Sequence, residues 1–270
     1  MIRGSKVIRK KVLVKAGGKR RIQRIESPTL DRSNVQVVNA KTQGSPFRRS
    51  TEIRAEKRHG KPKGFDWGKV KFSRVEKLWE GETAFLIGGG PSLSGFNFSQ
   101  LKNKRTIAIN KALFAYPQAD MLYWTDSRFY SWYKPEIDKF KGTKYTIKPY
   151  GDLHKSIKML KNTGKDGLEL DPSALRHGNN SGHAAMNLAY HLGVKRIVLL
   201  GFDMKNVQGK SHFHDGYPVH QTKTEVYSRS MIPHFYAISE GLKKRKVEVI
   251  NACPGSALKM FKKLPIEKAL

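Results

Sequence analysis

The sequence predicts an α/β fold, in which a Rossmann-like, mainly parallel sheet carries helices on both faces and follows a basic, extended N-terminal arm. Short apolar runs recur between residues 76 and 270, and helical or irregular stretches separate them. One such run, residues 83–87, leads directly into three glycines, as the first strand of many nucleotide-binding sheets does. Residues 1–75 differ, because they carry 22 lysines and arginines but only 5 acidic residues.

We expect residues 1–75 to form a largely extended or disordered arm and linker. The first 64 residues contain one aromatic residue, Phe47, and therefore cannot bury a sizeable core. Within this arm, the apolar and basic runs 11–15 and 21–25 flank Ala16-Gly17-Gly18. Two short runs on either side of a glycine turn predict a β-hairpin.

The charge of the arm predicts a polyanionic partner. The whole chain has a net charge of +30, and lysine and arginine contacts to phosphates give affinity without reading a sequence. Nucleic acid, either RNA or DNA, is therefore the expected partner, and a solvated tail or assembly segment is the alternative. The expected phosphate contacts are Arg9, Lys10, Lys11, Lys19, Arg20, Arg21, Arg24, Arg48 and Arg49.

The domain at residues 76–270 is predicted from its strands and one clear helix. The strands are expected at 83–88, 105–110, 121–125, 144–148, 196–202 and 246–251. The helix covers 181–192, where Asn180 or Ser181 caps its start and Gly193 ends it. It leads into the strand 196–202, as expected of a parallel sheet.

Composition also predicts the compartment. No apolar run approaches the roughly 18 residues of a membrane-spanning helix, so we expect no membrane insertion. Cys253 is the only cysteine, so an internal disulfide cannot form, which fits a reducing compartment. We therefore expect a cytoplasmic protein.

The glycine loop predicts a phosphate site, with a tight turn between elements as the alternative. It lacks the Gly-Lys-Ser/Thr ending of a P-loop, and Leu93 stands where a dinucleotide fold places its third glycine. The following strand ends in Asn110 instead of the acidic residue that binds an NAD ribose. An ordinary P-loop kinase or NAD enzyme is therefore disfavoured.

Several polar residues follow the predicted strands and should meet at one edge of the sheet. The ends of parallel strands and the start of the 181–192 helix would converge on one cleft, although each residue could instead cap a helix or form a turn. The expected nucleotide contacts are Gly88, Gly89, Gly90, Pro91, Ser92, Asn110, Thr125, Asp126, Asn180, Ser181 and Gly182.

Two histidines form a separate cluster. His212 and His214 face the same side of an extended segment, and Asp203 lies upstream of them. They could bind a metal, or they could contact a phosphate and transfer a proton; a plain polar loop is a further alternative. No third ligand has a diagnostic spacing, so we favour the phosphate role and assign no metal ligands.

In their order and spacing these motifs resemble the bacterial CMP-sialic-acid-dependent sialyltransferases. They are equally similar to the related group that includes the archaeal pterin pyrophosphokinase, motility-associated glycosyltransferases and small bacteriophage proteins. The resemblance covers about residues 80–268 and excludes the arm. It is carried by Ile87 to Leu93, Asn110, Asn180-Ser181-Gly182, Leu199 to Asp203, and Asn251 to Leu258.

The resemblance implies that the loop from Gly88 to Ser92 and Asn110 hold a nucleotide. It places Ser181 and Gly182 near a sugar nucleotide and aligns His212 with a tyrosine that contacts the phosphate. The sequence departs from the family at Gly89, where relatives have asparagine, and near Gly178, where they have arginine. The family's base histidine has two nearby counterparts, His220 and His234.

The resemblance therefore implies a nucleotide-dependent, glycosyltransferase-like transferase that uses a CMP- or UDP-linked donor. His212 or His214 would assist the leaving phosphate, and the candidate bases are Asp203, Asp126, His220 and His234. In a phage setting the enzyme would act in the host cytoplasm, on DNA reached through the arm. The alternatives are a non-catalytic nucleic-acid-binding or virion-associated protein and a pyrophosphokinase-like phosphotransferase; divalent metal dependence and oligomeric state are left open.

Overall fold

The computed structural model describes residues 9–16, 19–26, 70–147, 154–218 and 222–270. The chain divides into two compact units, Met1–Arg49 and Ser50–Leu270. In the first unit, β1 (Arg9–Ala16) pairs antiparallel with β2 (Lys19–Glu26), where the sequence predicts a hairpin. Seven of the nine basic residues expected to contact phosphates lie on these two strands, and Arg48 and Arg49 lie outside the described residues.

The second unit is built on an eight-stranded sheet with the order β12-β11-β10-β3-β4-β5-β6-β7. Every neighbouring pair in it is parallel. The strands are β3 (Thr83–Ile87), β4 (Arg105–Ile109), β5 (Met121–Trp124), β6 (Thr143–Thr146), β7 (Ile157–Met159), β10 (Arg196–Leu200), β11 (Glu248–Asn251) and β12 (Lys262–Lys263). All six predicted strands are present, and β7 and β12 are additional. A separate pair joins β8 (Lys161–Asn162) to β9 (Ala174–Leu175).

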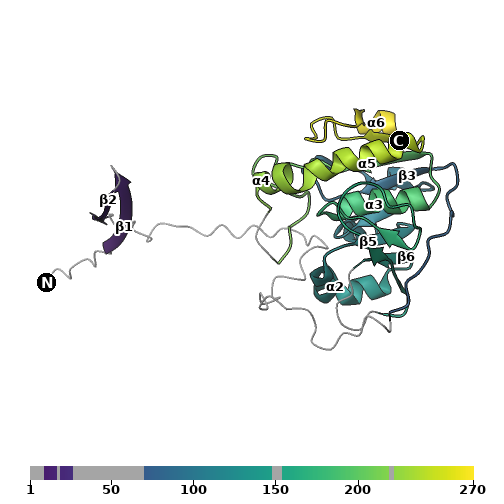
Figure 1. Cartoon of the computed structure of the whole chain (residues 1–270), viewed down its shortest axis with the longest axis horizontal. Helices are drawn as coiled ribbons and strands as arrows, with labels where there is room; N and C mark the ends of the chain where they lie inside the picture. The colour runs from purple at the N-terminus through teal and green to yellow at the C-terminus, as the bar shows by residue number, and fades with distance from the viewer. Residues whose placement is uncertain (1–8, 17–18, 27–69, 148–153, 219–221) are drawn as a thin grey trace, which may run out of the picture. The chain divides into compact units, whose positions relative to one another are not determined.

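Helices cover both faces of this sheet (Figure 1). On one face, α3 (Ser181–His191) packs against α5 (Ile232–Lys244), and Leu86 of β3 belongs to their core. On the other face, Phe85 and Ile87 pack with α1 (Ala112–Ala115) and α2 (Ser127–Lys139). Alternate residues of a buried strand thus serve opposite layers. The predicted Rossmann-like α/β fold is confirmed.

Short helices complete the unit. They are the 3-10 helices η2 (Pro91–Leu93) and η3 (Phe98–Leu101), α4 (Thr224–Val226), the π-helix η4 (Tyr227–Met231) and α6 (Ile266–Ala269). Within the described parts of the chain, no helix has the length and apolar character needed to cross a membrane.

Strand order places a topological switch between β3 and β10. The chain proceeds outward from β3 to β7 on one side, returns to β10 on the other side of β3, and proceeds outward again to β12. In open α/β sheets a crevice forms at the carboxyl ends of the two strands at such a switch. Here those strands end in Gly88 and Gly201.

The folded unit begins before residue 76, where the sequence sets the start of the domain. Val75 is buried in the core, and the N–H of Ser73 donates to the carbonyl of Met159 at 2.7 Å. Residues before position 76 therefore pack against the sheet of this unit.

Candidate functional site

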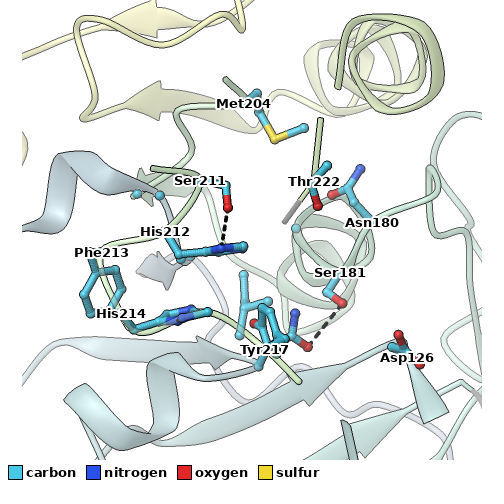
Figure 2. A pocket seen from close by; sticks show the side chains of 18 of the residues that line it. Asp126, Asn180, Ser181, Met204, Ser211, His212, Phe213, His214, Tyr217 and Thr222 are labelled. Carbon is cyan, nitrogen blue, oxygen red and sulfur yellow. Dashed lines mark hydrogen bonds between the residues drawn. The ribbon is translucent and has the colours of Figure 1, made fainter. Parts of the chain in front are cut away.

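A pocket of about 800 Å³ lies at the switch point, at the carboxyl edge of the sheet. The loop after β3, the end of β4, the starts of α2 and α3, the segment 209–217 and the π-helix η4 form its walls. Figure 2 shows part of this lining, including Asp126, Ser181 and the two histidines. Ten predicted site residues line it: Gly88, Gly89, Gly90, Asn110, Asp126, Asn180, Ser181, Gly182, His212 and His214.

Other predicted site residues lie elsewhere. Ser92, Thr125, Asp203 and His234 are described but do not line the pocket. Pro91 begins η2 behind the glycine loop, and His220 lies outside the described residues. The sequence did not single out the lining residues Arg128, Trp132, Asn179, Met204, Ser211, Tyr217, Thr222, Tyr227 and Met231.

The glycine loop uses most of its own polar groups to join β10. The N–H of Gly88 donates to the carbonyl of Leu200, and the N–H of Gly90 donates to that of Gly201, each at 2.8 Å. The carbonyl of Gly89 accepts from the N–H of Phe213 at 3.0 Å. The loop is therefore rigidly placed, but two of its three glycine amides are not available to a phosphate.

Asp203 fixes the same loop from the β10 side. Its carboxylate accepts from the backbone N–H of Ser92 at 3.2 Å and from the Ser92 hydroxyl at 2.8 Å. A Cβ added to Gly90 would lie 1.9 Å from Asp203 Oδ2, so only glycine leaves room for the carboxylate. Asp203 is nearly inaccessible, with 3% of its surface exposed, and acts here as a structural anchor.

The floor of the pocket is a network of short polar side chains. The hydroxyl of Ser181 accepts from the N–H of Thr125 at 3.1 Å and lies 3.4 Å from Oδ1 of Asn110 (Figure 2). Asn180 caps α3, because its side chain accepts from the N–H of His183 at 2.8 Å. This cap occupies the third amide of the helix, that of His183. The first two amides, those of Ser181 and Gly182, remain at the positive end of α3.

His212 and His214 stack against each other beside the glycine loop. Their ring centroids lie 4.7 Å apart, and Tyr217 packs edge-on against both rings at 5.2 Å. A Cβ on Gly89 would approach His212 to 3.1 Å and His214 to 3.3 Å. The two rings thus border the space that a side chain at position 89 would enter, which gives a steric reason for glycine there.

Both histidines are neutral near pH 7. Burial, with the positive charge of Lys111, lowers the pKa of His212 to about 4. Burial, with His212 and Lys111, lowers that of His214 to about 2. Nδ1 of His214 accepts from the N–H of Gly216 at 3.1 Å, so Nε2 carries the proton, and this buried donor has no hydrogen-bond partner among the described residues.

Lys111 places a buried cation behind these rings. Only 7% of its surface is exposed, and Nζ donates to the carbonyl of Gly216 at 2.8 Å. The ammonium lies 5.7 to 6.0 Å from the ring centroids of Phe114, Tyr133 and Tyr217. Burial lowers the pKa of Lys111, while Asp215 acts in the opposite direction. A positive charge of this kind favours an anionic ligand nearby.

The other candidate bases have partners of their own. Asp126 caps α2 by accepting from the N–H of Arg128 at 3.0 Å, and its carboxylate pairs with the Arg128 guanidinium at 2.6 Å. His234 contacts Asp166 through Nδ1 and lies 3.1 Å from Asn179 through Nε2. Within the described ranges, no three or more His, Cys, Asp or Glu residues are grouped so that they could hold a metal ion.

Comparisons with protein-family models, with curated proteins and with solved structures find no match to this chain. The family resemblance therefore stays a prediction from sequence motifs. What the pocket does must be argued from its own chemistry.

Proposed function

We propose that the pocket binds a nucleoside phosphate and that the protein is a glycosyltransferase-like transferase using a nucleoside-phosphate-activated donor. One observation carries this proposal. The N-terminus of α3 and the stacked pair His212 and His214 converge on one pocket at the topological switch, with the Lys111 cation behind the pair. Such crevices are the usual ligand sites of doubly wound sheets.

The pocket offers donors of the kind that phosphate oxygens accept. The amides at the start of α3 point along the positive end of the helix dipole. Because both imidazoles are neutral, they would act as hydrogen-bond donors, and the charge would come from Lys111.

In the proposed reaction, the oxygen of an acceptor hydroxyl forms a bond to the transferred sugar while the bond between the sugar and the leaving phosphate breaks, and the hydroxyl proton passes to an oxygen of the leaving phosphate. The leaving phosphate gains negative charge, which the α3 amides and the imidazole of His212 would stabilise. Asp126, Asp203 and His234 are each engaged elsewhere in the fold, so we do not include them as bases.

Release of nucleotide from CMP- and UDP-linked sugars tests the proposal. His212→Ala should lower the rate of release by roughly 10²- to 10³-fold, the usual contribution of one hydrogen-bond donor to developing negative charge, and leave nucleotide binding measurable. The matched control is His154→Ala, because His154 is exposed and its ring contacts Ser156, two positions away. Unchanged release in His212→Ala would remove His212 from the mechanism.

The second candidate is a nucleic-acid-binding protein that keeps the fold without the chemistry. The amides of Gly88 and Gly90 are used inside the fold, and both candidate carboxylates have partners, which favours this alternative. Removal of the first compact unit, residues 1–49, separates the two candidates. An enzyme would keep donor cleavage and lose affinity for nucleic acid, whereas a pure binding protein would have no cleavage to keep.

A further inference from the structure

Asn179 lines the pocket directly before α3, in a left-handed backbone conformation with φ of 58°. Its Nδ2 donates to the carbonyl of Ser230 at 3.0 Å and lies 3.1 Å from Nε2 of His234. A backbone carbonyl can only accept, so the amide nitrogen must face Ser230. The amide oxygen is therefore turned away from both acceptors.

His234 is held in the matching tautomer. Its Nδ1 contacts the carboxylate of Asp166, which can only accept when ionised, so Nδ1 carries the proton. Nε2 is then an acceptor, as the contact with the Asn179 amide requires. Asp166, His234 and Asn179 form a chain in which each donor meets an acceptor.

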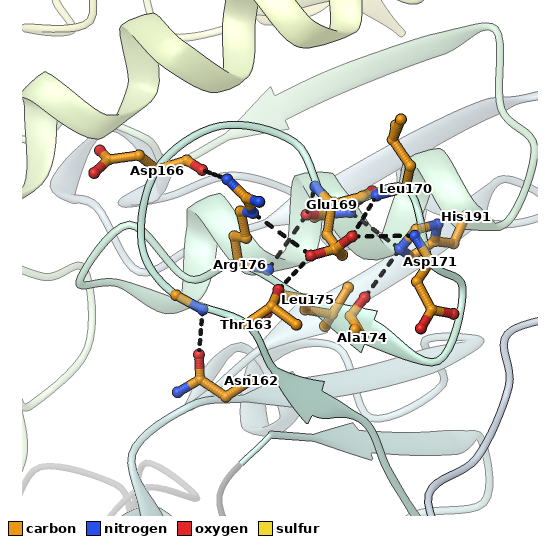
Figure 3. Close-up of polar contacts among 12 residues, drawn as sticks. Asn162, Thr163, Asp166, Glu169, Leu170, Asp171, Ala174, Leu175, Arg176 and His191 are labelled. Carbon is orange, nitrogen blue, oxygen red and sulfur yellow. Dashed lines mark hydrogen bonds and ion pairs between the residues drawn. The ribbon is translucent and has the colours of Figure 1, made fainter.

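The loop that carries Asp166 is fixed to α3 by a polar network that includes the buried side chain of Asn187 (Figure 3). Arg176 donates to the backbone carbonyl of Asp166 and lies 3.5 Å from the carboxylate of Glu169. Asn187, which is fully buried in α3, accepts from the N–H of Glu169 at 2.8 Å and donates to its carbonyl at 3.0 Å. The carboxylate of Asp166 is exposed, but these contacts fix the backbone that carries it.

The same Nδ2 of Asn179 also contacts the π-helix η4, which supplies Ser230. Tyr227 and Met231 of the same helix line the pocket. π-Helices are rare and frequently occur at functional sites. The contacts of Asn179 Nδ2 therefore connect the chain of Asp166 and His234 with the π-helix that forms part of the pocket wall.

We propose that Asn179 is a specificity-determining residue, whose Oδ1 accepts a hydrogen bond from an amino or hydroxyl group of the bound nucleoside. Asp166 and His234 are positioning residues that keep the amide in this orientation. This inference rests on the proposed nucleotide site and goes beyond it, because it names the kind of ligand group that Asn179 recognises.

Titration calorimetry with CMP and with UMP tests the inference. Asn179→Gly removes the side chain without straining the positive φ, and should weaken CMP binding roughly three- to tenfold, the effect of one hydrogen bond. Weaker binding of CMP alone would identify the cytosine amino group as the donor, because uracil has an acceptor at that position. Equal loss for both nucleotides would identify a ribose hydroxyl.

A double-mutant cycle tests the positioning role. His234→Phe should weaken binding in the wild-type background and have no further effect in Asn179→Gly. Asp166→Ala should weaken binding in the same way, whereas Asp166→Asn keeps an oxygen that accepts from Nδ1 and should restore it. Asp171→Asn is the matched control, because Asp171 is exposed in the same region and bonds locally, to Ser173.

Two outcomes would overturn the inference but leave the proposed function standing. One is additive effects of His234→Phe and Asn179→Gly on binding, and the other is equal affinity of Asn179→Gly and wild type for both nucleotides. Failure of the wild type to bind either nucleotide would instead overturn the proposed function, and the inference with it. Thermal midpoints of all variants, measured without nucleotide, separate lost contacts from lost folding.

Discussion

Asp203 binds Ser92 twice, accepting from its backbone N–H at 3.2 Å and from its hydroxyl at 2.8 Å. This contact joins the loop after β3 to the segment after β10, which are the two strands that border the topological switch. An acidic residue at the end of a strand suggests a base when only the sequence is considered. In the folded chain it holds the glycine loop in place.

Replacing Asp203 should therefore affect stability first. Asp203→Ala leaves the Ser92 N–H and hydroxyl without their partner, and should lower the free energy of unfolding by about 1–3 kcal/mol. Urea unfolding measures this effect. Glu267→Ala is the control, since Glu267 is exposed in α6. Equal stability of Asp203→Ala and wild type would contradict the anchoring role.

Gly90 should tolerate no side chain. A Cβ there would lie 1.9 Å from Asp203 Oδ2 and 2.5 Å from the carbonyl of Gly201, so Gly90→Ala must break the contact between the loops. We expect a loss of at least about 2 kcal/mol in unfolding free energy, typical of overpacking. Gly255→Ala, where the nearest atom is 3.9 Å away at the end of a lysine, should be nearly neutral. A Gly90→Ala variant as stable as Gly255→Ala would show that the loop is placed differently.

The effect of a substitution at Gly89 should depend on the histidines beside it. Gly89→Asn introduces a side chain into the space bordered by His212 and His214. We expect lower thermal stability, and recovery of part of the loss when His214→Ala is added, because the smaller residue makes room. Simple additivity of the two substitutions, seen in thermal unfolding, would argue against this packing.

Stability should fall on mild acidification. Burial lowers the pKa of His183 to about 4, as it does for His212, while an unfolded histidine titrates near about 6.5. Their contribution is complete above about pH 6.5 and is lost as the pH falls toward about 4, since the unfolded chain then binds more protons. Each group can add a slope of up to about 1.4 kcal/mol per pH unit. His212→Gln should flatten the pH dependence of urea unfolding, and a slope unchanged by this substitution would show that His212 is not buried in its neutral form.

Much of the fold could be predicted because strands such as β3, β5 and β10 are apolar runs that stop at turn residues or short polar residues. The strands β7 and β12 could not, since they have three and two residues and exist through pairing with their neighbours. Part of the site was predictable for a similar reason, because parallel strands bring Asn110 and the start of α3 to one edge.

The remaining features depend on contacts between distant segments. Asp203 and Ser92 are 111 positions apart, and no local pattern distinguishes an anchoring carboxylate from a base. Asn179 had a weak signal, because asparagine is one of the few residues that adopt a left-handed conformation before a helix. Its orientation follows from Ser230 and His234, which only the tertiary structure brings close.

A thermal-shift screen of the full chain with CMP, UDP, GDP and ATP, each with and without magnesium, tests the nucleotide site most directly. A ligand that binds the folded state raises the thermal midpoint, by an amount that grows with its concentration over Kd. We predict that CMP or UDP stabilises the wild type without magnesium, and that His212→Ala retains a measurable shift. Stabilisation by ATP only with magnesium would favour the pyrophosphokinase-like alternative. No shift with any nucleotide would contradict the proposal that this pocket binds a nucleoside phosphate.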